Sequence, residues 1–461
     1  MPQEPLFSRD EILSLISELD AAELEGIDKK SLTPLYDEIL VSGEGSRVKD
    51  REGKVYLDCT SQAWSLNIGF ANPDIAMAVS EQVSRLTHVR YGFPTIPRIK
   101  LINKLLEIAP SGLTKVCFNN SGGGQALEAA MKLAMINKSS TKPEAQMFVT
   151  FWRGYHGSSI ATTTLSQRFA GLMRYRPWGL DRVMKVPYPY CYRCPVGQEG
   201  RTSCKLQCLD LIATTIEYGS TDRIAGLIIE PMQGPGGHIP TPKGFLQDLK
   251  KICEDNEIYL IYDEAQTFTR IGWWTAAEYY GVSPHMMGLT KSLGGGIPIG
   301  ATLAAEELLG FTPAEEHTTF GSSPIMFASS LVYLHYVERA NLLENTRKMG
   351  EYLTAGLKKI QNTSDIGNYI GDIRCPGLFI GVELVEDRDT KKPANGLMMD
   401  TVEAANERGI IFGEMAPIIS DQEGLFRNVL KIKPPMIITK EDCDFILEIF
   451  EESVEEATDY L

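Results

Sequence analysis

The chain has 461 residues, and its 45 Lys and Arg residues against 60 Asp and Glu residues give a formal net charge of −15. This charge disfavours general binding to nucleic acid, because phosphate backbones attract basic proteins. Hydrophobic residues at 43% and charged residues at 23% are typical of a folded globular protein, which excludes a disordered or fibrous chain.

The N-terminal sequence has no basic segment followed by an apolar stretch, and no run approaches the ~20 apolar residues of a membrane span. We therefore expect a cytoplasmic protein that binds neither nucleic acid nor membranes. The nine cysteines are an odd number at ordinary density, which argues against a secreted disulfide framework.

The first predicted elements are a helix and a pair of strands. Ser8 and Glu11 have the spacing of a capping box in front of apolar residues with helical periodicity. Residues 47–58 predict two short alternating strands around a Glu-Gly turn.

Residues 75–330 predict an α/β fold. Short runs at 116–120, 147–151, 225–231 and 258–264 are apolar on both faces, and they alternate with helical stretches. Such runs are buried on both faces, which indicates a mostly parallel sheet sandwiched by helices. Ligands of these sheets bind beyond the carboxyl ends of the strands. From residue 331 the pattern changes to a helix, strands including 378–384 and a final helix, typical of a smaller domain.

One apolar run and one Gly-rich loop carry polar candidate residues. Asp263 and Glu264 end the run at 258–264 with Gln266 close behind, and Lys291 precedes the glycines at 294–296. The acid alone is equally typical of a turn or helix cap. A lysine in such a loop serves as a solvated charge, a phosphate ligand or a nucleophilic amine, and the order of residues is not that of a P-loop.

Two further strand ends carry candidate residues. Gly122 and Gly123 lie between a strand and an Ala-rich helix, where backbone N–H groups and the helix N-terminus bind anions. A plain flexible connection is the alternative. Tyr155 and His156 follow the run at 147–151 and offer an aromatic ring and an imidazole, or only packing.

These residues together match the requirements of pyridoxal 5'-phosphate. That cofactor needs a lysine to form a Schiff base, a carboxylate beside its pyridine nitrogen, a helix N-terminus for its phosphate and an aromatic ring to stack on it. The strand-end residues supply one of each.

Over residues 40–450 the chain resembles the class III (ω-amino acid) aminotransferases, fold-type I enzymes that use pyridoxal 5'-phosphate. The motifs that carry the resemblance are, in chain order, YLDCTSQAWSLNIGFANP, NNSGGGQALEAAMKLA, GYHG, IIEPMQGPGG, YDEAQTFTRIG, LTKSLGGGIPIGA, HTTFGSSP and VLKIKPPMIIT. The resemblance implies a large cofactor-binding domain at 75–330 and a smaller α+β domain built from 1–74 and 331–461.

The resemblance also implies site residues. The implied cofactor-binding residues are Gly122, Gly123, Tyr155, Glu230, Asp263, Gln266, Lys291 and Thr319. Lys291 would be the Schiff-base lysine and proton shuttle, and Asp263 would pair with the pyridine nitrogen. Thr319 would reach the phosphate from the neighbouring subunit, which implies a homodimer with active sites at its interface. No metal is predicted at the site.

The substrate residues depart from the common family pattern. Pro235 replaces a glutamate that masks the carboxylate-binding arginine in some members, and Lys431 stands where many members have that arginine. Arg427 is either a substitute for it or a surface charge. Trp64 resembles a tryptophan of ω-aminotransferases that use pyruvate, although a core tryptophan is the alternative.

We therefore expect ping-pong transfer of an amino group from an ω-amino donor, such as taurine or β-alanine, to pyruvate or 2-oxoglutarate. Racemases and amine phospho-lyases of the same class use the same lysine, so both stay as alternatives. The cysteine cluster, defined as Cys191, Cys194, Cys204 and Cys208, has three interpretations: a structural zinc site, two disulfides or reduced thiols.

Overall fold

The computed structural model describes residues 6–19, 23, 26–32, 38–119, 122–167, 182–197, 204–220, 223–413 and 428–459. Its largest sheet has seven strands in the order β4-β12-β11-β10-β7-β5-β6. These strands are β4 (Leu113–Asn119), β5 (Met147–Phe151), β6 (Val183–Val186), β7 (Ile224–Ile229), β10 (Tyr259–Asp263), β11 (Met286–Leu289) and β12 (Gly300–Ala305). Strand β12 pairs antiparallel with both β11 and β4, while the other neighbouring pairs of this sheet are parallel, which confirms the prediction of a mostly parallel sheet.

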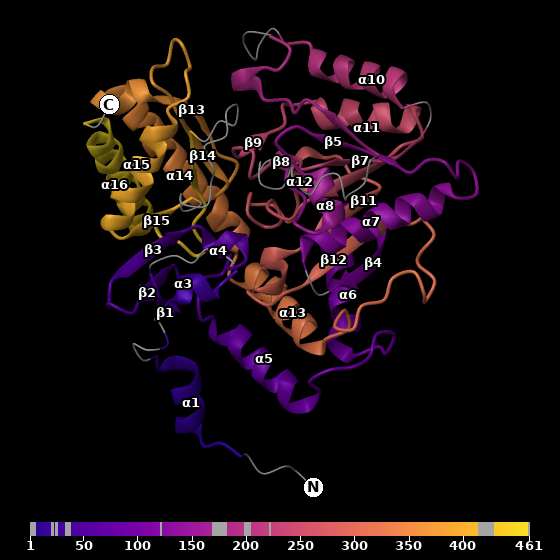
Figure 1. The fold of residues 1–461 in the computed structure, drawn as a ribbon, viewed down its shortest axis with the longest axis horizontal. Coiled ribbons are helices and arrows are strands. Elements are labelled where there is room, and N and C mark those ends of the chain that lie inside the picture. The colour runs from indigo at the N-terminus through magenta and orange to yellow at the C-terminus, as the bar shows by residue number, and fades with distance from the viewer. Residues whose placement is uncertain are drawn as a thin grey trace.

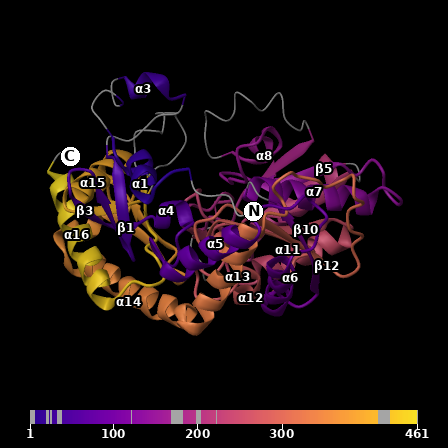
Figure 2. The same cartoon turned by 90° about the horizontal axis from the view of Figure 1, so that it is seen from below.

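Helices cover both faces of this sheet (Figure 1). The helices of this part of the chain are α5 (Pro73–Arg85), α6 (Ile96–Ile108), α7 (Gly123–Lys138), α8 (Ile160–Leu165), α10 (Gln207–Gly219), α11 (Phe245–Asp255), α12 (Ala276–Tyr280) and α13 (Pro324–Arg339). Of these, α5 packs mainly against α13 and not against the sheet. In Figure 2, α7 and α8 lie on one side of β10 and α11 on the other. Every residue of β7 and β12 is buried, because each of these strands is covered on both faces.

A second group of elements combines both ends of the chain. It contains β1 (Leu40–Glu44), β2 (Arg47–Asp50), β3 (Val55–Cys59), β13 (Ile370–Arg374), β14 (Ile380–Leu384), β15 (Ile410–Phe412), β16 (Val429–Ile432), α14 (Leu342–Thr363), α15 (Asn395–Glu407) and α16 (Lys440–Thr458). Strand β3 pairs in parallel with β15, so that Leu57 lies opposite Ile410. The N-terminal and C-terminal segments therefore share one sheet, seen as indigo beside yellow in Figure 1.

The remaining elements are short. They are α1 (Arg9–Ser17), α3 (Ile27–Lys30), α4 (Ser61–Trp64), η2 (Cys191–Arg193), β8 (Met232–Gln233), β9 (Ile239–Pro240), η3 (Lys291–Gly294) and η4 (Asp365–Tyr369). The predicted capping box of α1 is confirmed, since Ser8 Oγ accepts from Glu11 N at 3.2 Å and Glu11 Oε2 accepts from Ser8 N at 2.7 Å. The helix projects from the body of the molecule with no buried residue.

The cysteine cluster consists of free thiols, one of its three interpretations. Burial raises the pKa of the Cys208 thiol to about 12, and the neighbouring sulfurs of Cys204, Cys191 and Cys194 add to the shift. Within the described ranges, no group of three or more His, Cys, Asp or Glu side chains is arranged to hold a metal ion. No helix of these ranges has the length and apolar character to cross a membrane.

A buried ionic cluster joins β14 to the segment that follows β6. The side chain of Glu383 is 0% exposed and pairs with Arg374 at 2.7 Å and with Arg193 at 2.6 Å. Tyr190 also donates its hydroxyl to Glu383. Burial alone would raise the pKa of Glu383, but Arg374, Tyr190 and Arg193 outweigh it, so the pKa lies below its usual 4.5.

Replacing Glu383 by Gln should lower the free energy of unfolding by about 3–5 kcal/mol at pH 7, because two buried guanidinium groups lose their counter-charge. A carboxylate with a lowered pKa stabilises the fold above its usual pKa and loses this effect as the pH falls through its folded value. The difference in unfolding free energy between the wild-type protein and Glu383→Gln should therefore narrow below pH 4.5. Urea titrations of both proteins across this range would measure it.

The matched control is Glu386→Gln, because Glu386 pairs with Lys392 while both side chains are largely exposed. The free energy of unfolding of this control should fall by less than about 1 kcal/mol. An equally small loss in Glu383→Gln would contradict the importance of the buried cluster.

Candidate active site

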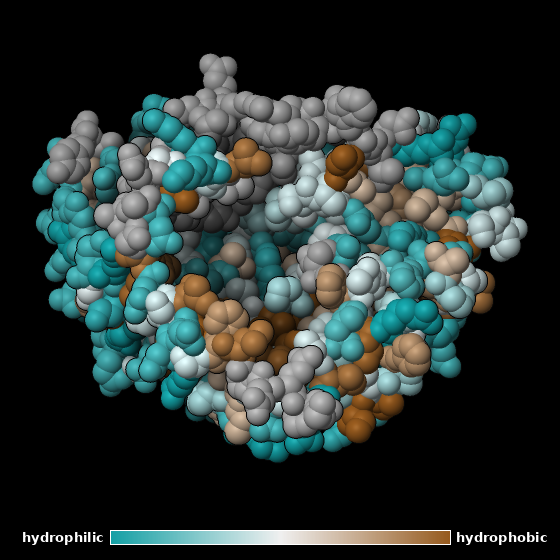
Figure 3. Space-filling view, turned by 60° about the horizontal axis from the view of Figure 1, so that its bottom comes forward, coloured by the Kyte–Doolittle hydropathy of each residue, from teal (hydrophilic) through white to brown (hydrophobic). Residues whose placement is uncertain are grey.

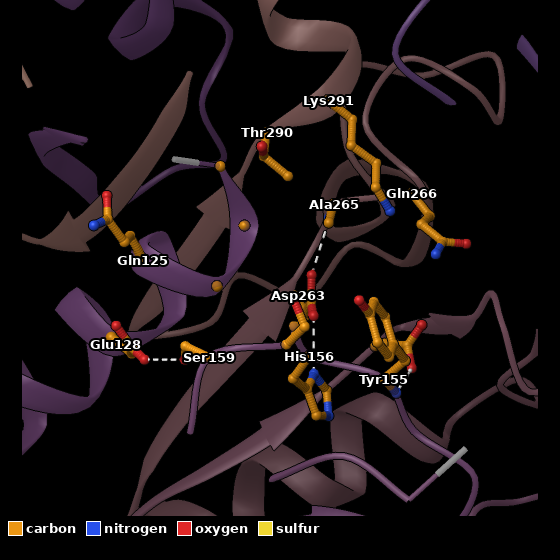
Figure 4. A pocket seen from close by; sticks show the side chains of 16 residues that line it. Gln125, Glu128, Tyr155, His156, Ser159, Asp263, Ala265, Gln266, Thr290 and Lys291 are labelled. Carbon is orange, nitrogen blue, oxygen red and sulfur yellow. Dashed lines mark hydrogen bonds and ion pairs between the residues drawn. The ribbon is translucent and has the colours of Figure 1, made fainter. Parts of the chain in front are cut away.

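A cavity of about 630 Å³ opens at the carboxyl ends of β4, β5, β7, β10 and β11 (Figure 4). The space-filling view shows a central hollow with hydrophilic side chains inside it (Figure 3). Seven of the residues predicted to bind the cofactor line this cavity: Gly122, Gly123, Tyr155, Glu230, Asp263, Gln266 and Lys291. The parallel strands bring them together, because residues that follow parallel strands meet at one edge of the sheet.

Lys291 follows β11 and begins the turn η3. Its backbone has φ +54°, a left-handed conformation that costs a residue other than glycine about 1–3 kcal/mol and persists where the surroundings fix it. The surroundings here include Ser292, whose hydroxyl donates to Phe268 O at 3.3 Å. The side chain of Lys291 extends into the cavity toward Gln266 (Figure 4).

Asp263 ends β10 and is fixed by two hydrogen bonds. Its Oδ1 accepts from Ala265 N at 3.0 Å, and its Oδ2 lies 2.8 Å from Nδ1 of His156. The carboxyl group is only 5% exposed, so these partners determine its orientation. His156 is a functional candidate that sequence reasoning noted only as a strand-end imidazole, because its partner lies 107 positions away in the chain.

Glu230 holds two turns of the cavity wall. Its carboxylate accepts hydrogen bonds from Tyr155 N at 3.0 Å and Gly234 N at 2.9 Å. Burial raises the pKa of Glu230 to about 7, although nearby His156 opposes this shift. Glu230 thereby positions the backbone that carries the Tyr155 ring.

The glycines before α7 are required by their conformation and by crowding. Gly122 has φ +90°, and a Cβ on Gly123 would lie 2.9 Å from Cγ2 of Thr290. Gly122, Gly123 and Gly124 all line the cavity at the start of this 16-residue helix. The backbone can therefore approach an anion closely there, and the helix dipole favours negative charge.

Trp64 ends α4, a turn of four consecutive residues with positive φ from Ser61 to Trp64. Trp64 lines a second cavity of about 340 Å³ and is 4% exposed. Nζ of Lys291 lies 4.9 Å from the centroid of its ring, and Nζ of Lys433 lies 3.3 Å from it. The left-handed turn thus aims the tryptophan at the lysine of the first cavity.

The other predicted residues lie elsewhere. Lys431 is buried, with its Nζ donating to Pro235 O at 3.2 Å. Thr319 is exposed and lies outside the cavity of its own chain. Arg427 falls outside the described residues. Sequence reasoning missed Lys433, although its spacing of two from Lys431 on an extended segment places both side chains on one face.

Comparison with known proteins identifies the family. Residues 31–454 match the family described as Aminotransferase class-III. The chain belongs to this family. It is 34% identical to a leucine/methionine racemase of Thermococcus litoralis over 90% of each chain. It is also 31% identical to a taurine–pyruvate aminotransferase of Bilophila wadsworthia, over 93% of this chain and 96% of the relative.

A solved structure agrees with this assignment. The omega transaminase of Pseudomonas jessenii in complex with PMP superposes with a TM-score of 0.83 at 27% identity, covering 98% of this chain and 99% of the other. The fold-type I architecture, the enzyme class and the dependence on pyridoxal 5'-phosphate inferred from the sequence are therefore confirmed.

The cavity residues of this class III enzyme fit its cofactor. The glycines and helix N-terminus suit a phosphate, and the cavity also holds an amine and a buried carboxylate. Oε1 of Gln266 is buried with no hydrogen-bond partner among the described residues. A Cβ on Gly234 would lie 1.8 Å from that oxygen, so the glycine is needed to leave room for the Gln266 amide.

Replacing Ala63 by Gly should raise the free energy of unfolding by about 0.5–1 kcal/mol, because glycine adopts positive φ without steric cost. Ala63 is exposed, so little packing changes. The matched control is Ala76→Gly at an exposed position inside the right-handed helix α5, where the same substitution should destabilise by about 0.5–1 kcal/mol. Thermal or urea unfolding would measure the change in unfolding free energy of each variant. Destabilisation by Ala63→Gly would contradict the inference that the turn is strained.

Replacing His156 by Leu should weaken cofactor binding about 10–100-fold, because the buried Asp263 carboxylate loses a partner worth ~1.5–3 kcal/mol. Equilibrium dialysis of pyridoxal 5'-phosphate would measure the change. His335→Leu serves as the control, since His335 is half exposed on α13 outside the cavity. Unchanged cofactor affinity in His156→Leu would show that this histidine does not contribute to cofactor binding.

Proposed function

We propose that the enzyme transfers an amino group from an ω-amino donor, such as taurine or β-alanine, to a 2-oxo acid such as pyruvate or 2-oxoglutarate. The observation that carries the proposal is the position of Lys291, whose amine lies between the cavity of Asp263 and the ring of Trp64. One site would serve both half-reactions, so the kinetics are ping-pong. The similarity to a taurine–pyruvate aminotransferase supports this choice of donor.

Bound pyridoxal 5'-phosphate supplies an electron sink for the carbon that carries the reacting amine. Lys291 would bind the cofactor covalently and then carry the proton at its Nζ. Asp263, oriented by His156, would keep the pyridine nitrogen protonated by its negative charge. These two residues would be the catalytic ones.

The other cavity residues would bind the cofactor. Gly122 and Gly123 would hold its phosphate through backbone N–H groups, and the ring of Tyr155 would stack on it. Gln266 would approach the ring hydroxyl, while Glu230 would position the turn that contains Tyr155.

The proposed assembly is a homodimer. Thr319 would contribute to the phosphate site of the neighbouring subunit, which its exposure in its own chain supports. The adjacent Phe320 is 57% exposed, an apolar side chain suited to an interface.

A racemase is the second candidate, supported by the 34% identity with the leucine/methionine racemase. Racemisation would use the same lysine but return the proton to the carbon that lost it. The two functions therefore differ in whether a carbonyl product leaves the site.

The role of Lys291 can be tested by replacement with Ala. The purified enzyme should have a visible absorption band from its lysine-bound cofactor, and Lys291→Ala should lose it. The control is Lys358→Ala, at an exposed position of α14, which should keep the band. A wild-type enzyme without the band after addition of the cofactor would overturn the proposal.

The donor can be identified in single half-reactions with taurine, β-alanine, 4-aminobutyrate, ornithine and alanine. A true donor should bleach the visible band and yield a carbonyl product, and pyruvate or 2-oxoglutarate should restore the band. Racemisation of an optically pure amino acid without bleaching by any donor would instead favour the racemase.

A further inference from the structure

The loop at residues 316–323, which leads into α13, presents two exposed residues on buried flanks. Thr319 and Phe320 are exposed, and we call these two residues the tip of the loop. Glu316 before the tip is 5% exposed, and Ser322 after it is 0% exposed. The side chains on either side of the tip are therefore packed into the body of the molecule.

The side of the loop that precedes the tip is anchored by two contacts. The carboxylate of Glu316 pairs with Nζ of Lys132, on the helix α7, at 2.6 Å. The rings of His317 and Tyr91 have centroids 5.2 Å apart and meet edge to face. An ion pair and a ring contact thus fix the residues immediately before the tip.

Arg98 of α6 anchors the side that follows the tip. Its Nη1 donates to Ser322 Oγ at 3.1 Å. Its Cζ lies 5.6 Å from the centroid of the Tyr91 ring and 6.0 Å from that of Phe327. A planar guanidinium lies over a ring and donates a hydrogen bond at the same time. Because Tyr91 also contacts His317, Arg98 connects both sides of the loop.

The anchored tip carries a hydroxyl group that the cavity of its own chain does not use. Thr319 is absent from the lining of that cavity. A threonine hydroxyl donates to a phosphate oxygen, and a donor that is fixed in advance binds with a smaller loss of conformational entropy. The neighbouring Phe320, 57% exposed, suits burial in the interface of the proposed homodimer. These properties suit a loop that acts on a second copy of the chain.

We propose that Arg98 is a positioning residue, which fixes the tip through Ser322 so that Thr319 reaches the cofactor phosphate of the neighbouring subunit. This inference rests on the proposed function and on the homodimer that it includes. Each active site then depends on the partner subunit's Arg98 and not on its own.

The first test compares the wild-type enzyme with Arg98→Met, which keeps an unbranched side chain and removes the guanidinium group. Each apoenzyme is titrated with pyridoxal 5'-phosphate, and the visible band of the lysine-bound cofactor reports the bound fraction. The affinity of Arg98→Met should be ~10-fold lower, because a hydrogen bond from a charged group is lost. Unchanged affinity would overturn the proposal.

The matched control is Arg223→Met. Arg223 is exposed and directly precedes β7, at the amino end of the strand and so at the edge of the sheet opposite the cavity. Its affinity for the cofactor should change less than about twofold. An equal loss in both variants would show that removal of any arginine has this effect, and would overturn the proposal.

Mixed dimers, made from two differently tagged chains, show which subunit Arg98 serves. In the first dimer one chain carries Lys291→Ala and the other Arg98→Met, so the only site that forms the band is served by an intact loop. In the second dimer one chain carries both substitutions and the other is wild type, so that site is served by the altered loop. The first should bind the cofactor like the wild type, and the second ~10-fold more weakly. The reverse order, or equal affinities, would overturn the proposal.

Ser322→Ala tests the same hydrogen bond from the loop, should Arg98→Met fail to fold. Used in place of Arg98→Met in the two mixed dimers, it should give the same order of affinities. Either substitution added to Thr319→Val should lower the affinity less than about twofold further, because both act through the Thr319 hydroxyl. Losses that multiply would show that Arg98 acts by another route and would overturn the proposal.

These results are separate from the outcome for the proposed reaction. If the second mixed dimer binds the cofactor more weakly than the first but no donor bleaches the wild-type band, the aminotransferase function fails and the role of Arg98 stands. If donors bleach the wild-type band but both mixed dimers bind the cofactor equally, the reaction stands and the role of Arg98 fails.

Discussion

The hydrogen bond between Asp263 and His156 is the interaction around which the active site is organised. A carboxylate that is 5% exposed would be expensive to bury without donors, and His156 and the Ala265 N–H supply them. The pair joins the ends of β5 and β10, and Glu230 anchors the turn next to His156 through the Tyr155 N–H. The floor of the cavity is therefore fixed before any cofactor arrives, which is the preorganisation that electrostatic catalysis requires.

Backbone conformation adds a second constraint. Lys291 and the four residues Ser61–Trp64 all have positive φ although none is glycine. Each of these backbone conformations costs free energy, so folding alone would not favour two strained segments that meet at the ring of Trp64. The strain directs a lysine and a tryptophan toward a common point, and the packed sheet that surrounds them supplies the stability to hold them there.

Much of this site could be predicted from sequence because its residues follow strands of a parallel sheet. Asp263 lies at the end of one predicted apolar run and Tyr155 follows another, and topology then brings them together, whereas Lys291 was singled out by the glycines that follow it. The pairing of His156 with Asp263 and the contact of Lys433 with Trp64 depend on tertiary contacts that no local pattern encodes. Antiparallel β12 was not predicted as a separate strand, because its sequence continues the Gly-rich lysine loop without a clear boundary.

The pairing of β3 with β15 has a consequence for synthesis on the ribosome. The strands of the seven-stranded sheet all lie between Leu113 and Ala305 and can assemble while the rest of the chain is still being made. The Ser61 hydroxyl must wait for Lys433, which is 372 residues further along. Nascent protein would thus acquire its cofactor-binding sheet first and its pocket beside Trp64 only after Lys433 has been made, so that a product terminated before Lys433 would lack the latter.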